Sequence, residues 1–206
     1  MKNKKTPAIR FKGFTDDWEQ RKLGDVAEIG DIDHRMPSAV SFGVPYLMTG
    51  DFVGVNELNF DGVKQISEED YEKLSKKIKP EKGDILFARY ASVGAVRYVD
   101  FTKKFLISYS CAIIKSSKKI NSRFLYYFLT SNVAQKQILS EIKTGSQANI
   151  GIDVMKNNII IPVLALDEQK KLSIIFKKID CIITLHQRKL EKLQQIKKAM
   201  LEKMFV

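Results

Sequence analysis

The apolar residues of the last forty positions recur with alternating steps of four and three. The stretch 167–206 contains neither Gly nor Pro, so nothing in it breaks a helix. We expect Asp167 to cap the start of that helix, after the segment that Pro162 closes. A four-three repeat is typical of a coiled-coil seam, with His186 and Lys197 here as its polar positions. The apolar seam positions, which we assign to dimerisation, are Leu172, Phe176, Ile179, Ile183, Leu190, Leu193, Met200 and Met204.

A helix of this length is too long for the rest of the chain to cover. Forty residues at about 1.5 Å each extend roughly 60 Å. We therefore predict that the apolar stripe packs against the same stripe of a second copy, with the two helices antiparallel. The alternative is a long helix that folds back on its own domain.

The preceding residues alternate short apolar runs with turns, which indicates strands and short helices. Ser67 begins a capping-box-like pattern and should start a helix. Residues 16–23 resemble a capped turn with Trp18 as its apolar anchor. We expect strands at 44–47, 85–88, 94–99, 105–114 and 158–163, and helices at 67–77 and 122–139. The prediction is an α+β fold, in which a globular domain at 1–164 holds a mixed β-sheet and short helices and a long coiled-coil helix follows at 165–206.

The net charge of the chain indicates which kind of partner it could bind. Its 206 residues carry 35 Lys and Arg against 24 Asp and Glu, a net charge of +11. Residues 1–14 and 167–206 each hold an excess of five positive charges, which leaves about +1 for the middle. This balance favours a polyanion such as nucleic acid.

Other bulk features narrow the class of protein. An apolar content of 44% argues against disorder. Cys111 and Cys181 lie in apolar surroundings, which predicts two buried thiols. No apolar run approaches 18 residues and no signal-peptide pattern occurs, so we expect a cytoplasmic protein without a membrane span.

Enzymatic signatures are absent from the sequence. Neither His34 nor His186 has a second ligand at metal-binding spacing, so we predict no metal site. The glycine patterns of nucleotide sites are missing, and we therefore expect no cofactor in this chain. Glu81, Lys82 and Asp84 make a nuclease-like set only if forced, because such residues fill ordinary turns. We predict no catalytic residues.

Two loops carry groups that can contact DNA. The first loop, at 89–94, follows an apolar strand and contains a cation, an aromatic ring and a hydroxyl. The second loop, at 143–149, contains a lysine, two hydroxyls and two amides. Such groups pair with guanine, adenine and phosphate. The alternative is a pair of ordinary polar loops. The candidate DNA-binding residues are Arg89, Tyr90, Ser92, Lys143, Thr144, Ser146, Gln147 and Asn149.

Four segments together resemble the specificity subunit of Type I restriction–modification enzymes. They are 6–29 (TPAIRFKGFTDDWEQRKLGDVAEI), 82–94 (KGDILFARYASVG), 144–150 (TGSQANI) and 159–180 (IIIPVLALDEQKKLSIIFKKID), so the likeness covers essentially the whole chain. The combination of WEQRKLGDVAEI with the IP-x4-DEQ junction makes the resemblance specific. The family usually has two recognition domains, each followed by a long helix, whereas this sequence has one of each. Pro162 also lacks the second proline that is common at the junction.

The resemblance implies a non-catalytic subunit that binds double-stranded DNA, reads one half of a split sequence and pairs through its helix. Its partners would be modification subunits that bind S-adenosylmethionine and methylate an extruded adenine, and a restriction subunit that uses ATP and Mg. The alternatives are a protein-only coiled-coil adaptor and a stand-alone methyltransferase or nuclease, which would need cofactor motifs that are missing. The bases read, the gap length, the presence of a restriction subunit and the choice between a natural half-subunit and part of a longer subunit stay open.

Overall fold

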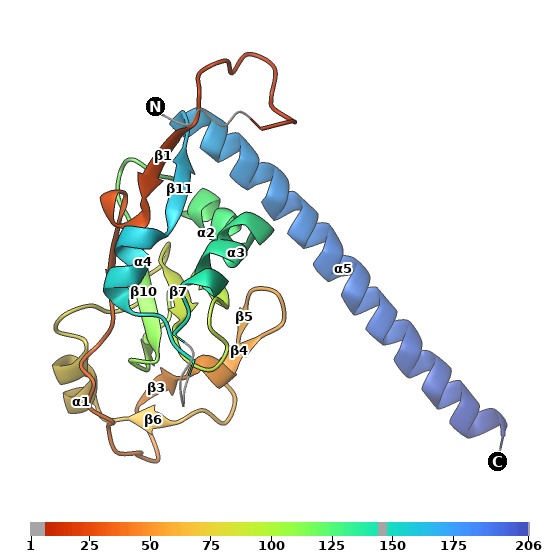
Figure 1. The fold of residues 1–206 in the computed structure, drawn as a ribbon. Coiled ribbons are helices and arrows are strands. Elements are labelled where there is room, and N and C mark those ends of the chain that lie inside the picture. The colour runs from red at the N-terminus through yellow and green to blue at the C-terminus, as the bar shows by residue number, and fades with distance from the viewer. Residues whose placement is uncertain (1–6, 144–147, 206) are drawn as a thin grey trace.

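The computed structural model describes residues 7–143 and 148–205. In this part of the chain the strands are β1 (Glu19–Lys22), β2 (Ala27–Gly30), β3 (Val44–Leu47), β4 (Phe52–Val53), β5 (Glu57–Leu58), β6 (Gln65–Ile66), β7 (Ile85–Ala88), β8 (Val96–Tyr98), β9 (Leu106–Ile107), β10 (Cys111–Ser116) and β11 (Ile160–Val163). The helices are α1 (Glu68–Leu74), α2 (Ser122–Thr130), α3 (Asn132–Ser140), α4 (Ile152–Asn158) and α5 (Leu166–Met204). They form an α+β domain from which α5 projects as a single long arm (Figure 1).

The centre of the domain is an antiparallel sheet in the order β2-β10-β7-β8. All four residues of β7 are completely buried. Because side chains alternate across a strand, Ile85 and Phe87 enter one core and Leu86 enters the other. The sheet therefore separates two hydrophobic cores, which explains why β7 and the first half of β10 are uninterrupted apolar runs.

Each core is closed by its own set of elements. Helices α2, α3 and α4 supply Leu125, Ile138 and Met155 to the first core. A three-stranded sheet, β6-β3-β9, and helix α1 cover the second core. Strand β3 is antiparallel to β6 and parallel to β9, which confirms the expected mixed sheet. Ser67 caps α1 as predicted, because its side chain accepts a hydrogen bond from the Asp70 N–H.

Several expected elements differ from the structure. Residues 19–22 form strand β1, paired with β11, instead of the capped turn expected around Trp18. The strand expected at 105–114 is interrupted where the Ser108 hydroxyl accepts a hydrogen bond from the Ser110 N–H (3.3 Å). The helix expected at 122–139 divides at Ser131, whose extended backbone (ψ 151°) ends α2 and whose side chain caps α3. Helix α4 was not predicted.

Helix α5 begins two residues earlier than expected, with Ala165 in place of Asp167 at the cap position. Ala165 makes no side-chain hydrogen bond there. Asp167 therefore lies in the first turn, where its negative charge interacts favourably with the positive end of the helix dipole. From Cys181 to Phe205 every residue is exposed except the half-buried Thr184. The expectation of two buried thiols is therefore wrong for Cys181, whereas Cys111 is buried. In the described residues no helix is long and apolar enough to span a membrane.

Candidate nucleic-acid interface

The structure joins the two loops that the sequence analysis selected. Tyr90 and Asn149 form an antiparallel bridge, and Asn149 forms a second one with Lys143. The Ile150 N–H donates to the carbonyl oxygen of Arg89 (3.1 Å), and the Lys143 N–H donates to that of Asn149 (3.0 Å). Tyr90 and Asn149, 59 positions apart, thus share one edge of the domain. Thr144, Ser146 and Gln147 lie outside the described residues.

The loop after β7 has a fixed and strained shape. Ala91 has a φ of 58°, the left-handed conformation that an L-residue with a side chain adopts at a cost. Gly94 (φ 91°) lies so close to α3 that an added Cβ would stand 2.8 Å from the Gln135 side chain, which itself donates to the Gly94 carbonyl (2.9 Å). The loop is held by its neighbours in a single form, with Ser92 exposed and Tyr90 half-buried. Strain of this kind is characteristic of binding sites.

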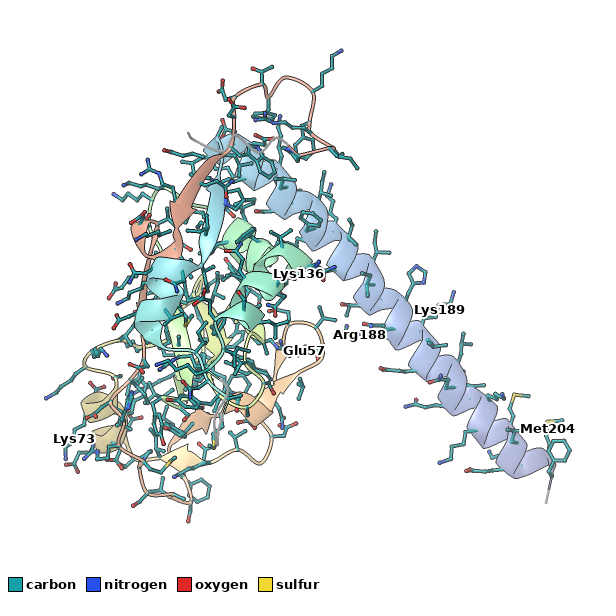
Figure 2. The ribbon with its side chains drawn as sticks, in the orientation of Figure 1. Glu57, Lys73, Lys136, Arg188, Lys189 and Met204 are labelled. Carbon is teal, nitrogen blue, oxygen red and sulfur yellow. The ribbon has the colours of Figure 1, made fainter. Side chains whose placement is uncertain are left out.

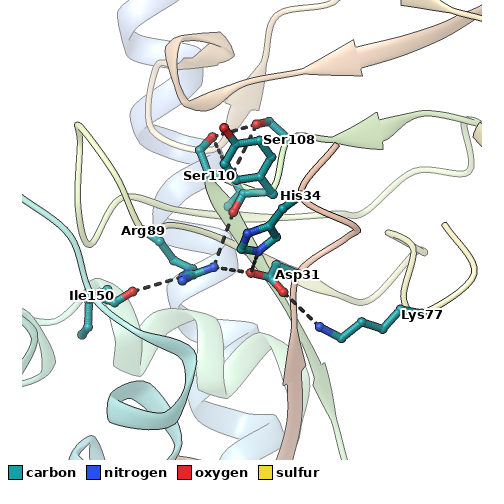
Figure 3. Close-up of polar contacts among 9 residues, drawn as sticks. Asp31, His34, Lys77, Arg89, Ser108, Ser110 and Ile150 are labelled. Carbon is teal, nitrogen blue, oxygen red and sulfur yellow. Dashed lines mark hydrogen bonds and ion pairs between the residues drawn. The ribbon is translucent and has the colours of Figure 1, made fainter. Parts of the chain in front are cut away.

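Arg89 does not extend to the surface, which corrects the expectation that this loop presents a cation. Only 6% of the residue is exposed. Its guanidinium forms an ion pair with Asp31 and donates to the carbonyl oxygens of Ile150 (3.1 Å) and Tyr109 (3.4 Å) (Figure 3). Contact between Arg89 and DNA stays a prediction, but the geometry gives the side chain a different task. It ties together the segments after β2, β7, β9 and α3.

Asp31 is the acceptor at the centre of this cluster. Besides Arg89 it binds the Lys77 ammonium (3.1 Å) and the His34 ring (2.9 Å), and His34 stacks on the Tyr109 ring with centroids 4.9 Å apart (Figure 3). Burial alone would raise the pKa of Asp31, but hydrogen bonds from His34 and Lys77 and the charge of Arg89 outweigh it and lower the pKa. The cluster is thus stable with Asp31 ionised.

A basic hollow of about 400 Å³ lies beside this cluster. His34 and the lysines at positions 73, 76 and 77 line it, together with Asp33 and two apolar residues. Lys73 projects from the end of α1 at the edge of the domain (Figure 2). Lys77 is paired with Asp31 and Lys73 with Glu69. A concave surface lined by three lysines, two of which are exposed and ion-paired, suits a phosphate backbone.

Sequence reasoning missed Asp31, His34, Lys77 and Tyr109. One signal could have indicated Asp31: an arginine directly after a fully apolar strand is a candidate for burial, and a buried arginine requires an acceptor, best one of opposite charge. The short stretch 31–34 follows strand β2, which is buried except at Glu28, and offers two aspartates. No periodicity reveals which of them turns inward.

The nuclease-like set has an ordinary structural explanation. Asp84 accepts hydrogen bonds from the Lys115 ammonium (2.6 Å) and from the Glu81 backbone N–H (2.8 Å). Lys115 also binds Glu81 (2.9 Å), so the three side chains close a turn against β10. Lys82 is not among these contacts. Across the described ranges, no group of three His, Cys, Asp or Glu side chains is placed to hold a metal ion.

The predicted seam lies on α5 and divides into two parts. Leu172 packs against the first core, and the Phe176 ring meets Tyr127 of α2 with centroids 5.2 Å apart. From Ile179 to Met204 the apolar seam residues are between 43% and 69% exposed. The domain therefore half-buries Leu172 and contacts one side of Phe176, which stays 43% exposed, and it leaves the later seam residues exposed. These later positions lie on the part of α5 that projects from the domain (Figure 1). Whether a second copy covers them stays a prediction.

Known proteins resemble the chain in sequence and in fold. The family model for the Type I restriction modification DNA specificity domain matches residues 15–195. A Methanocaldococcus jannaschii protein, described as the MjaX specificity subunit of a type I restriction enzyme, is 27% identical over 200 residues, which cover 92% of this chain and 46% of that protein.

Two solved structures share the fold at low sequence identity. The HsdS subunit from Thermoanaerobacter tengcongensis superposes with a TM-score of 0.59 at 18% identity, over 89% of this chain and 41% of that chain. A chain from structural work on the complex assembly and conformational transition of the type I R-M system gives a TM-score of 0.61 at 19% identity, over 97% of this chain and 48% of that chain. The chain spans about half the length of these relatives.

Proposed function

The chain belongs to the Type I restriction–modification DNA specificity family, and from that premise we propose that it reads one half of a split DNA sequence and dimerises through α5. The combination that supports this proposal is one recognition domain and an arm whose apolar stripe that domain leaves uncovered. Specificity subunits of this family recognise DNA and catalyse nothing. The chain would accordingly direct chemistry that other subunits perform.

The joined loops would read the bases. Tyr90, Ser92, Lys143 and Asn149 lie on one edge, and a hydroxyl, an ammonium and an amide there can pair with base edges in the major groove. Thr144, Ser146 and Gln147 belong to the same predicted loop. The lysine-lined hollow beside Asp31 would hold the phosphate backbone and orient the duplex. Arg89 would not contact the bases itself; its buried contacts would hold the two loops together beneath this surface.

The exposed stripe of α5 would pair with the same stripe of a second copy, antiparallel. A two-fold axis through the paired arms places the recognition domains at opposite ends and makes both read the same half-site. The target is therefore a bipartite palindrome with a fixed gap. An arm of 39 residues is about 58 Å long. Since DNA rises about 3.4 Å per base pair, that length leaves several unread base pairs between the half-sites.

Catalytic partners would assemble on this dimer. We assign adenine methylation to modification subunits that bind S-adenosylmethionine, and cleavage to a restriction subunit that uses ATP and Mg. Two features support the assignment: the family membership of the chain and its likeness to a chain studied for complex assembly in a type I R-M system.

Methylation mapping tests the proposal directly. The chain is expressed with its modification subunit, as the sole specificity component, in a cell whose methylated adenines are then sequenced. We expect one bipartite palindromic motif with a single gap length. An asymmetric motif would contradict recognition of the same half-site twice, and it would show that one chain does not supply both half-sites.

The dimer is tested separately by changes along the arm. Replacing Ile179, Ile183 and Leu190 together by Glu puts three charges into the seam and should give monomers by light scattering at micromolar concentration. A matched control puts Glu at Cys181, Gln195 and Ala199, which point away from the seam, and should stay dimeric. A dimeric seam variant would exclude the seam as the interface.

Salt-dependent DNA binding separates DNA recognition from the protein-only adaptor. In the complex with the modification subunit, Lys76→Ala should weaken binding to all sequences alike and reduce the salt slope by about 0.9. Tyr90→Ala should weaken cognate binding and leave non-specific binding unchanged. A complex whose DNA affinity does not depend on salt would favour the adaptor.

A further inference from the structure

The base of α5 is attached to the domain mainly by polar contacts. The buried residues of this 39-residue helix are Glu168, Gln169 and Ser173, all of them polar. A surface helix ordinarily docks through an apolar stripe. Here Leu172 packs against the first core and Phe176 contacts Tyr127, but the fully buried side chains that face the domain are hydrogen-bonding ones. Beyond these contacts the apolar stripe runs on into solvent. This arrangement calls for an explanation beyond stability, because apolar contacts give stability without directional bonds.

These polar groups connect α5 to the start of α2. The Gln169 side chain accepts a hydrogen bond from the Asn121 N–H (2.7 Å) and donates to the Leu164 carbonyl (2.7 Å). The Ser173 hydroxyl has two acceptors for its single hydrogen, the Asn121 side-chain oxygen (2.9 Å) and the Gln169 carbonyl oxygen (2.8 Å). The same Asn121 oxygen caps α2 by accepting from the Phe124 N–H (3.0 Å). One asparagine therefore joins the first turns of two helices.

A third element closes the attachment. Glu168, only 1% exposed, binds the Arg10 guanidinium through both carboxylate oxygens (2.8 and 2.9 Å). A bidentate pair of this kind fixes geometry as well as charge. We call Arg10, Asn121, Glu168, Gln169 and Ser173 the arm socket. It binds the helix base to the N-terminal segment on one side and to α2 on the other.

A second point of contact follows farther along the helix. The Tyr127 hydroxyl of α2 donates to the Asp180 carboxylate (2.8 Å), and the Tyr127 ring packs on Phe176. Two points of attachment, separated by about 10 Å along the helix between Ser173 and Asp180, define a direction as well as a position. Beyond Thr184 the arm is exposed up to Phe205 and has no further support from its own domain.

The free arm amplifies any change of angle. From Asp180 to Met204 the helix extends about 36 Å. A tilt of about 5° at the base moves its tip by about 3 Å, which is nearly the rise of one base pair. An arm that sets a fixed gap must therefore be held to within a few degrees. Directional hydrogen bonds in a buried site provide such precision, because they lose strength steeply when misaligned.

We propose that the arm socket fixes the direction of α5 relative to the recognition domain and thereby restricts binding to targets with one gap length. The inference rests on the proposed function, because it assumes two half-sites spaced by paired arms. Its five members are positioning residues. They do not contact DNA, and they act through the angle of the helix.

The test compares gap selectivity in an otherwise equal complex. Three DNA duplexes carry the two half-sites with the wild-type gap, with one base pair more and with one base pair fewer. The binding affinity of the complex of chain and modification subunit is measured for each duplex. The wild type should prefer its own gap at least tenfold. In Gln169→Ala/Ser173→Ala that preference should fall at least threefold, while affinity for a single half-site stays the same.

Controls separate a changed angle from a weakened fold. Gln195→Ala removes the same side chain from the exposed part of the arm and should keep the wild-type preference. Asn121→Asp retains a side-chain oxygen that can accept hydrogen bonds from Ser173 and from α2. This variant should therefore also keep the wild-type gap preference. If the double variant does not fold, Ser173→Ala alone serves, since it removes one hydroxyl. A general loss of stability would lower binding at every gap alike.

A distance measurement reports the angle without DNA. Spin labels replace Lys136 on α3 and Arg188 on the arm in a Cys181→Ser background, with excess unlabelled chain so that each dimer carries one labelled copy (Figure 2). The distance distribution should be narrow with the socket intact and at least twice as broad in the double variant.

The outcomes distinguish the two proposals. A wild-type complex that binds all gaps equally would refute the proposed function, and this inference with it. A wild type that selects one gap, with socket variants that keep both the selectivity and the narrow distance distribution, would overturn this inference alone.

Discussion

Removing Asp31 should destabilise the domain far more than removing either of its exposed partners. Both side chains of the Asp31–Arg89 ion pair are only 7% exposed, so water does little to screen the pair. Breaking a buried pair by deleting one partner costs about 3–5 kcal/mol, because the other charge stays behind without compensation. Arg89 would keep its two carbonyl acceptors, which puts the expected cost of Asp31→Ala at the lower end, about 3 kcal/mol.

Lys77 supplies the matched comparison. It binds the same carboxylate, but its side chain is 67% exposed. Exposed pairs contribute about 0–1 kcal/mol, so Lys77→Ala should cost less than about 1 kcal/mol. The free energy of unfolding is measured by urea denaturation at pH 7 in the seam variant, for which we expect a monomer, because the stability of a dimer would depend on protein concentration.

A double-mutant cycle isolates the pair itself. Asp31→Leu/Arg89→Met replaces two charges by apolar groups and should be less destabilising than the sum of the two single changes by more than about 1 kcal/mol. Equal losses for Asp31→Ala and Lys77→Ala, or additive single changes, would refute the view that Arg89 and Asp31 form the central brace of the loops.

Three further predictions concern single sites. The pKa of Asp31 is lower in the folded chain than its unfolded value of about 3.9. Ionised Asp31 therefore stabilises the fold at pH values above the unfolded pKa, and this contribution is lost as the pH falls through the folded pKa. A fall in pH should accordingly destabilise the wild type more than Asp31→Asn. Burial raises the pKa of Cys111 to about 12, so a thiol reagent at pH 8 should modify the exposed Cys181 within minutes and Cys111 only after unfolding. Gly43→Ala should lower the free energy of unfolding by more than about 2 kcal/mol, because its Cβ would stand 2.1 Å from a backbone oxygen of β6. In the control Gly50→Ala, the added Cβ meets no atom within 4 Å, so the change should be nearly neutral. The midpoints of urea unfolding compare the two variants.

Local patterns in the sequence were sufficient for some elements. Ser67 with acidic residues behind it specifies the start of α1 without tertiary help, and the four apolar residues of β7 specify a buried strand. The long helix followed from the absence of Gly and Pro and from the seam repeat. In each case the information lies within one short window.

Other features depend on residues that are distant in sequence. Strand β1 has four exposed residues and becomes a strand because β11 pairs with it, some 140 positions later. The long helical pattern at 122–139 hid the break at Ser131, because a serine can either continue a helix or cap the next one. Arg89 was expected at the surface since its partner Asp31, 58 positions away, could not be identified from spacing. The two loops were selected because each carried groups that can contact DNA, and that role stays a prediction. The bridge that joins them depends on the tertiary structure and could not be predicted from either loop alone.

Strand β7 connects the arm socket to the loops that would read the bases. At its start, the Gly83 carbonyl accepts a hydrogen bond from Ser122 (2.7 Å), which follows the socket residue Asn121 directly. At its end, Arg89 holds the loops. Between these points the strand is completely buried, pairs with β10 on one side and β8 on the other, and cannot tilt without breaking both ladders and both cores. We therefore expect the domain between the loops and the arm to move as one unit, and we predict that any tolerance in gap length arises at the arm socket or in the free part of α5.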